Sequence, residues 1–250
     1  MRAIILGSGS KGNSTLLIGK NKKILIDVGF SYPKIVNDLS KYGFKPSDID
    51  AILITHTHKD HIAGLKTFIH KNIIPVYTNE IMLPELIKTT DYDNYITCDD
   101  EYNVDEFNIL AIHTSHDAKG SVGFLISDDN SSLVYITDTG YLNERYLKKI
   151  INKNIYIMES NHDINMLMTG PYPFILKQRV LSDKGHLSNE TAGNYLNKLI
   201  GKDTKRVILA HLSEINNTPD IAISTVSRII DNRIKIEVAS QNESFDVGEF

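Results

Sequence analysis

Six short apolar segments of this chain each end at a histidine or a carboxylate, and this repetition limits what the chain can fold into. The residues at these ends are Asp27, His56, His116, Asp138, Glu159 and His211. In open α/β sheets, ligands bind where strands end in loops. One such end would mean little, but six predict that these side chains share one cleft.

The pattern of apolar residues alternates between strand-like and helix-like segments. Strands are predicted at 2–6, 13–18, 22–29, 50–55, 74–78, 107–117, 121–128, 132–140, 154–160, 206–213 and 234–239, with the last closing the chain. Helices are predicted at 32–43, 61–71, 79–88, 143–150, 188–200 and 218–231, with Pro84 breaking or resetting the third. Two similar halves predict an α/β fold, a four-layer αββα sandwich, formed by a single domain over 1–250.

Composition excludes two broad classes of protein. With 41% hydrophobic and 23% charged residues, the chain fits neither a disordered nor a membrane protein. The only cysteine, Cys98, excludes an internal disulfide and favours a reduced, cytoplasmic setting. The first residues favour a strand and turn over a secretory signal. The formal net charge of −4 indicates that any polyanion is held locally, for example by bound divalent cations.

The segment THTHKDH, residues 55–61, concentrates metal-ligand side chains. Alternate side chains of an extended segment point to one side, so His56 and His58 can grip one ion. Asp60 and His61 are adjacent and would address a second ion beside it. Asp138 is the candidate bridging carboxylate. Imidazole and carboxylate ligands without cysteine suit zinc, iron or manganese.

This ordered set resembles the metallo-β-lactamase superfamily along almost the whole chain. The resemblance rests on Asp27 in DVG, the histidine motif, His116, Asp138 and His211, in the family's order. It implies that His56, His58 and His116 hold a first divalent ion. It further implies that Asp60, His61 and His211 hold a second, that Asp138 bridges them and that Asp27 supports the motif. Two such ions would activate a water for hydrolysis, with Asp60 among the catalytic residues.

Differences from other members of the family favour a nuclease. Lactamases of this fold place a cysteine in the second metal site, where this chain has Asp138. Thioester hydrolases typically show TPGHT at the third motif, which here is HTSHDAKGS. The intervals from His116 to Asp138 and from Asp138 to His211 are too short for the protruding arm of tRNA-processing relatives or for a β-CASP domain. We therefore expect no β-CASP or exosite insertion.

Three further segments resemble the YycJ/WalJ group of small bacterial exonucleases. They are LGSGSKGNSTLLI, MESNHDINML and LKQRVLSDKGHLSNETA. This likeness implies a 5′-to-3′ exonuclease that acts on DNA. Glu159 and His186 resemble a pair in the tRNA-processing relatives, which implies that His186, oriented by Glu159, donates a proton to the leaving oxygen. A purely structural Glu–His hydrogen bond is the alternative.

Candidate substrate-binding residues lie in glycine-rich and basic segments. Backbone N–H groups of GSGSKGNS, with Ser10, Lys11 and Asn13, could cradle a phosphate, or the segment could be a plain turn. Lys184 and Ser188 could serve the same purpose, although Ser188 or Asn189 also fits a helix cap. His162 and Asp163 could line the substrate groove or cap the next helix. Lys177 and Arg179 fit either a nucleic-acid contact or a solvated helix face.

Three alternative functions remain open. The chain could hydrolyse a small phosphodiester or thioester metabolite, or it could be an RNA-processing nuclease. It could also be a metal-binding sensor or adaptor that works by protein contact. The favoured partner is nucleic acid, above all DNA, without a membrane. His70, His113 and Cys98 are interpreted as structural, and the sequence predicts no oligomeric state.

Overall fold

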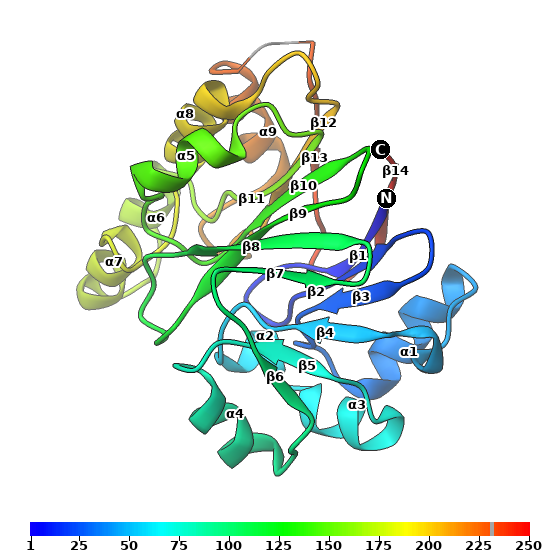
Figure 1. Ribbon diagram of the computed structural model, residues 1–250. Coiled ribbons are helices and arrows are strands. Elements are labelled where there is room, and N and C mark those ends of the chain that lie inside the picture. The colour runs from blue at the N-terminus through cyan, green and yellow to red at the C-terminus, as the bar shows by residue number, and fades with distance from the viewer. Residues whose placement is uncertain (231–232) are drawn as a thin grey trace. The chain divides into compact units, whose positions relative to one another are not determined.

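The computed structural model describes residues 1–230 and 233–250, and its internal contacts divide the chain into two compact units (Figure 1). The first unit contains 1–111, 118–122 and 240–249, and the second contains 112–117, 123–239 and residue 250. Neither unit is continuous in sequence, because the chain passes from one to the other several times. That the whole chain behaves as a single domain stays a prediction.

The first unit is built on a seven-stranded sheet of order β14-β1-β2-β3-β4-β5-β6. Its strands are β1 Arg2–Gly7, β2 Ser14–Ile18, β3 Lys23–Ile26, β4 Ala51–Leu53, β5 Val76–Thr78, β6 Tyr95–Thr97 and β14 Phe245–Glu249. Pairing is antiparallel from β14 to β3 and parallel from β3 to β6. Strands β7 Glu101–Val104 and β8 Phe107–His113 form an antiparallel hairpin.

Helices α1 Tyr32–Lys41, α2 Lys59–Ile62, α3 Leu65–Asn72 and α4 Leu83–Thr90 belong to this unit, with a 3₁₀ turn at Pro46–Asp48. The helix predicted over 61–71 is wrong in one respect, because it is divided at Gly64 into α2 and α3. A Cβ at Gly64 would lie 1.8 Å from the carbonyl oxygen of Phe30, so the chain approaches too closely there for any other residue. Pro84 does not break a helix but lies in the first turn of α4, where no N–H is needed.

The second unit contains five neighbouring strands in the order β13-β12-β11-β10-β9. They are β9 Val122–Ser127, β10 Ser132–Ile136, β11 Ile155–Glu159, β12 Arg206–Ala210 and β13 Lys235–Val238, and β10 to β13 are parallel. The helices are α5 Glu144–Ile150, α6 Ile164–Thr169, α7 Phe174–Leu181, α8 Asn189–Leu199 and α9 Pro219–Ser227. Helix α8 contacts α9, and α9 contacts β13 (Figure 1).

Two predictions about the C-terminal part need correction. The strand over 234–239 does not close the chain, because β14 follows and pairs with β1. The alternation of Phe245 and Val247 with polar residues was the available signal for this strand. The helix predicted over 218–231 ends at Ser227, and its predicted last residue, Asp231, lies outside the described residues.

The central strands are buried along their length except at their first residues. Residues 3–6 of β1, 24–26 of β3 and 207–210 of β12 are all buried and apolar. Continuous apolar runs of this kind occur where both faces of a sheet are covered. The sheets therefore form rigid platforms whose strand ends carry the polar residues. No helix among residues 1–230 and 233–250 has both the length and the apolarity to cross a membrane.

We expect Asp38→Asn to lower the free energy of unfolding by about 1–3 kcal/mol, because it weakens a buried charged network on α1. The Asp38 carboxylate is buried and accepts hydrogen bonds from Lys34 Nζ at 2.6 Å and Lys41 Nζ at 2.7 Å. Burial works to raise the pKa of Asp38, but the two lysines lower it below its usual value. Urea unfolding at pH 7, with exposed Asp129→Asn as a control without effect, measures the loss.

The same pair of proteins gives a pH test. Because the folded-state pKa of Asp38 is depressed, its stabilisation is complete above the usual carboxyl pKa of about 4 and is lost as pH falls through the folded value. The difference between parent and Asp38→Asn should therefore shrink as the pH falls below about 4. A difference that stays constant down to pH 2 or so would contradict this explanation.

Candidate metal centre

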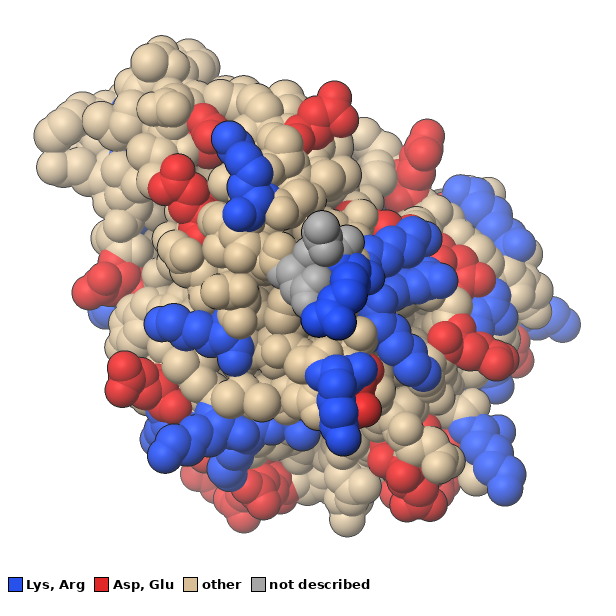
Figure 2. All heavy atoms as spheres, turned by 90° about the horizontal axis from the view of Figure 1, so that it is seen from above, with Lys and Arg blue, Asp and Glu red and all other residues tan. Residues whose placement is uncertain are grey.

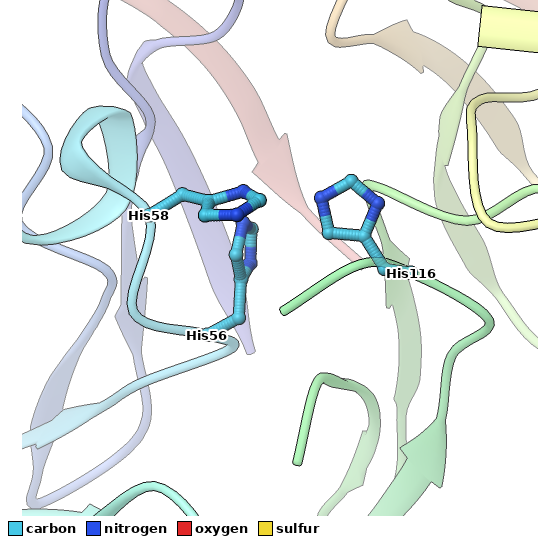
Figure 3. Close-up of side chains that lie close together, drawn as sticks. All are labelled: His56, His58 and His116. Atoms are coloured by element: carbon cyan, nitrogen blue, oxygen red, sulfur yellow. The ribbon is translucent and has the colours of Figure 1, made fainter. Parts of the chain in front are cut away.

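The histidine motif forms a loop between β4 and α2 in the first unit. His56 and His61 are buried. The ring centroid of His56 lies 4.8 Å from that of His58 and 4.0 Å from that of His61. Figure 3 shows the rings of His56 and His58 beside each other; His116, also labelled there, belongs to the second unit. The loop brings together His56 and His58, as their alternation predicts, and places His61 next to them.

Asp27 lies beneath this loop and fixes its imidazoles. Its carboxylate is inaccessible to solvent and accepts hydrogen bonds from the Thr55 N–H at 2.8 Å and the Thr55 hydroxyl at 2.7 Å. His61 Nδ1 lies 2.7 Å from the same carboxylate, so this nitrogen carries the proton. Burial raises the pKa of Asp27, and the contacts with His61 and Thr55 partly offset that increase.

This arrangement fits a metal ligand. With the proton of His61 on Nδ1, its Nε2 presents a lone pair, and the Asn13 amide lies 3.1 Å from that atom. A carboxylate behind a histidine orients metal-binding imidazoles in this way. Asp27, which follows β3, holds His61 in this way. The described donors on this loop are the imidazole and carboxylate types that zinc, iron and manganese accept.

Backbone hydrogen bonds hold three distant segments together around the loop. Asn13 N–H donates to Asp60 O at 2.8 Å, Gly29 N–H to Asn13 O at 2.9 Å and Val28 N–H to His61 O at 2.8 Å. Asn13 is fully buried, and its side chain also bonds with Gly9. The glycine-rich turn and the histidine motif are therefore one connected structure.

In the second unit, Glu159 has the role that Asp27 has in the first. Its carboxylate is fully buried at the end of β11, and His186 Nδ1 and His211 Nδ1 lie 2.7 and 3.1 Å from Oε1. The other oxygen, Oε2, accepts from the N–H groups of Thr139 and Leu187, both at 3.0 Å. Both oxygens of Glu159 are thus engaged, and both imidazoles present Nε2 away from it.

The electrostatics of this pair follow from the contacts. Burial works to raise the pKa of Glu159, but the His186 charge and the hydrogen bonds from His186 and His211 lower it to about 2. Burial works to lower the pKa of His186, but the facing Glu159 carboxylate raises it above its usual value. The geometry therefore favours an ionised Glu159 beside a protonated His186.

Asp138 lies close to three imidazoles of the same unit. Its Oδ1 is 3.5 Å from His211 Nε2, 3.7 Å from His186 Nδ1 and 3.8 Å from His116 Nε2. Asp138, Glu159, His186 and His211 each offer a ligand atom within 4.8 Å of the others. Burial lowers the pKa of His116, which keeps its imidazole neutral and suited to a metal. The four strand-end residues of this unit are therefore brought together.

Three of the predicted site residues have a left-handed backbone. The φ angles are 61° at Asp27, 54° at Asp138 and 55° at His211. Non-glycine residues seldom adopt this region, although aspartate and histidine tolerate it better than most. Each residue follows closely on the end of a parallel strand. The left-handed backbone therefore ends the extended conformation at the edge of the sheet.

Two contacts at these sites were not predicted. Thr55, between β4 and His56, bonds with Asp27 and lies 3.1 Å from the Nδ1 atoms of both His56 and His61. Arg179 of α7 forms an ion pair with Asp117, which neighbours His116. A threonine at the end of a buried strand was the only available signal for the first contact, and the second depends on tertiary structure.

The predicted substrate-binding residues fall into two groups. Ser10, Lys11 and Lys184 are exposed, as a substrate contact requires. Ser188 is buried and caps α8 by accepting from the Thr191 N–H at 3.1 Å. Asn13 is fully buried, and its side chain bonds with Gly9. Neither nitrogen of His162 has a hydrogen-bond partner within the described parts of the chain, and burial lowers its pKa to about 4. Of the two residues named as possible caps, Asp163 caps α6 by accepting a hydrogen bond from the Met166 N–H at 2.8 Å.

The residues interpreted as structural behave in that way. His70 Nε2 lies 2.8 Å from the Thr90 carbonyl oxygen, between two helices of the first unit. The His113 ring packs 6.3 Å from that of Tyr146. Burial raises the pKa of Cys98 to about 11, so its thiol stays protonated and unreactive at neutral pH.

We expect Gly29→Ala to lower the free energy of unfolding by about 3 kcal/mol or more. A Cβ at this position would lie 1.8 Å from the carbonyl oxygen of Asp60, which cannot move without breaking its bond with Asn13. Gly43→Ala is the control: it has open space but a φ of +81°, so about 1–2 kcal/mol of backbone strain is expected. Equal losses in urea unfolding would show that the close approach at Gly29 is unimportant.

The chain matches known proteins along most of its length. Residues 7–211 match the model of the "Metallo-beta-lactamase superfamily". "Exodeoxyribonuclease WalJ" of Streptococcus pneumoniae is 37% identical over 230 residues, covering 89% of this chain and 85% of that protein. "Exodeoxyribonuclease YycJ" of Bacillus anthracis is 35% identical over 234 residues, covering 92% and 89%.

A solved structure shows the same fold. The metallo-β-lactamase fold protein YhfI from Bacillus subtilis aligns with a TM-score of 0.74 at 18% identity, covering 98% of this chain and 100% of that one. Two sheets flanked by helices, and the family match over residues 7–211, confirm the predicted fold class. The chain belongs to the metallo-β-lactamase superfamily.

Proposed function

We propose that this protein is a metal-dependent phosphodiesterase that degrades DNA exonucleolytically from the 5′ end. The observation that carries the proposal is the similarity, over about nine-tenths of the chain, to proteins named exodeoxyribonucleases. The local geometry agrees with it, because each unit presents a cluster of histidines and carboxylates at the ends of parallel strands. Cys98 as a free thiol is compatible with a cytoplasmic location, which is part of the proposal.

The proposed cofactor is a pair of divalent ions: zinc, manganese or iron. Following the family pattern, His56, His58 and His116 would hold one ion. Asp60, His61 and His211 would hold the other, with Asp138 as the shared ligand. When bound, such ions supply an ionised water for attack on phosphorus and positive charge for the phosphate oxygens. Asp27 and Glu159 would act behind the ligands by fixing the Nε2 atoms of His61 and His211 in the ligand position.

His186 is the proposed proton donor to the leaving oxygen. It is partly exposed, its Nδ1 is held by Glu159, and the facing carboxylate raises its pKa, which favours a proton on Nε2. Glu159 is then a positioning residue, since both of its oxygens are occupied by protein hydrogen bonds. Ser10, Lys11 and Lys184 are proposed to contact substrate phosphates, which would give little dependence on base sequence. His162 and Ser188 are buried, so we propose that they support this region and do not contact the substrate.

The decisive assay uses 5′-labelled duplex DNA with manganese. We expect release of labelled mononucleotides by the parent. Asp60→Asn and Asp138→Asn should lose that activity, because each removes a carboxylate ligand of the proposed ions. Lys66→Gln, on the exposed side of α3, is a matched surface control that should remain active.

Other outcomes would support the alternative functions. Full metal occupancy without product on any nucleic acid would indicate a sensor or adaptor. Activity limited to RNA would indicate an RNA-processing nuclease. Turnover of a small cyclic phosphodiester or a thioester, with DNA untouched, would indicate a metabolite hydrolase.

The role of His186 can be separated from metal binding by changing the leaving group. His186→Asn should lower kcat on DNA by a factor of about 10²–10⁴, because the departing sugar oxygen needs a proton. The same variant should change turnover of bis(p-nitrophenyl) phosphate much less, because p-nitrophenolate leaves without one. Glu159→Gln should instead lower turnover of both substrates, because Glu159 also holds the proposed metal ligand His211.

Metal content, measured by elemental analysis, is the control for this comparison. It should stay at the parent level in His186→Asn. If both substrates lose activity equally, or if metal is lost, His186 is a binding residue and the proposed proton transfer is wrong.

A further inference from the structure

The loop that follows β10 carries an exposed aromatic ring close to Asp138 and the imidazoles around it. Asp138 is buried, whereas Tyr141, three residues later in the chain, has 42% of its surface exposed. Three residues of extended chain span at most about 11 Å, so the Cα atoms of these two residues are no farther apart than that. The reaction proposed above uses no aromatic side chain, which leaves the role of this ring to be explained.

Backbone contacts hold this loop between the segments that precede His116 and His186. The Gly140 N–H donates to the Ser115 carbonyl oxygen at 2.9 Å. A Cβ at Gly140 would lie 2.2 Å from the carbonyl oxygen of Asp183, so the loop approaches that backbone too closely for any residue but glycine. The loop is thus fixed against both segments.

The backbone of Tyr141 is held by hydrogen bonds on both sides of the residue. Its carbonyl oxygen accepts a hydrogen bond from the Thr139 hydroxyl at 2.7 Å. The next residue, Leu142, is buried, and its N–H donates to the Tyr195 hydroxyl at 3.2 Å. The Tyr141 hydroxyl, by contrast, has no hydrogen-bond partner in the part of the chain that the structure describes. The loop therefore presents a positioned aromatic ring to the solvent.

Charge alone does not explain how this protein would hold a nucleic acid. The net charge is −4, and on the face shown in Figure 2 acidic side chains lie among the basic ones. Near the loop, Lys184 is exposed, but so is Asp183 beside it. A substrate strand therefore needs a contact other than charge close to the proposed metal ligands. Stacking on an aromatic ring is such a contact, because every base has a flat π-face.

We propose that the ring of Tyr141 stacks on the base of the nucleotide next to the bond that is cleaved, so that the enzyme favours substrate ends whose base is unpaired. This inference rests on the proposed nuclease function. A base inside a duplex is covered by its neighbours and reaches a protein ring only after it leaves the stack. Frayed or single-stranded ends are therefore cleaved faster than blunt ends. Because the contact uses the π-face, it selects no particular base.

The test uses the metal-loaded full-length chain and single-stranded DNA labelled at its 5′ end. One strand has a normal terminal nucleotide, and the terminal sugar of the other carries no base. Duplexes with a blunt or a frayed 5′ end form a second pair of substrates. The variants are Tyr141→Ala, Tyr141→Leu and Tyr141→Phe, and Ile87→Ala on α4 removes a side chain of similar exposure as a control. Thermal unfolding and metal content check each variant.

On the normal strand, Tyr141→Ala and Tyr141→Leu should lower kcat/KM by about 5- to 150-fold, the range for one base stacked on an aromatic ring. Tyr141→Phe keeps the ring and should match the parent, as should Ile87→Ala. On the strand without a terminal base, the parent should be slower by a similar factor. Tyr141→Ala should cause no further loss there, because the stacking partner is missing. The parent should also prefer the frayed duplex to the blunt one, and Tyr141→Ala should reduce that preference.

Two results would overturn the proposal and leave the nuclease function intact. One is a Tyr141→Ala variant that is as active as the parent on the normal strand. The other is an equal loss on the strands with and without a terminal base, which would show that the ring supports the loop and does not contact a base. If the parent releases no nucleotide from any of the substrates, the proposed function itself fails and this inference fails with it.

Discussion

Two carboxylates that solvent does not reach, Asp27 and Glu159, orient the imidazoles of His61, His186 and His211. A buried carboxylate is tolerated only when its oxygens are hydrogen-bonded, so each must have its full set of donors in place. Thr55 and His61 donate hydrogen bonds to Asp27. His186, His211 and two backbone N–H groups donate to Glu159. The need to satisfy these groups fixes the tautomers and ring orientations before any ion or substrate arrives.

The same principle operates in both units although they share no sequence in these segments. In each, parallel strands end at one edge of a sheet, and a residue with left-handed backbone follows a strand closely. The parallel pairing brings the strand ends to one edge of the sheet. The left-handed residue then stops the backbone from continuing as a strand. Strain of this kind is stored where the surrounding structure over-determines it, and here it occurs at Asp27, Asp138 and His211 among other positions.

The sequence was sufficient for the fold class and for the residues gathered in each unit, because both depend on local order. Apolar runs ending in Asp27, Asp138 or His211 indicate strand ends without any knowledge of tertiary contacts. The ion pair of Arg179 with Asp117 could not be predicted in this way, because it joins α7 to a loop far away in sequence. The capping role of Ser188 and the closing strand β14 were ambiguous or missed, because short polar and short alternating segments carry weak signals.

The pairing of β14 with β1 has a consequence for how the protein is made. Residues 2–5 have partners at 245–249, so β1 leaves the ribosome long before β14 and must wait while the elements between them are synthesised. During that interval an apolar strand has an unpaired edge, which is the kind of surface that aggregates. Contacts so distant in sequence also slow the search for the native state. The first unit is therefore expected to depend on chaperone protection during translation more than a unit with local strand pairing would.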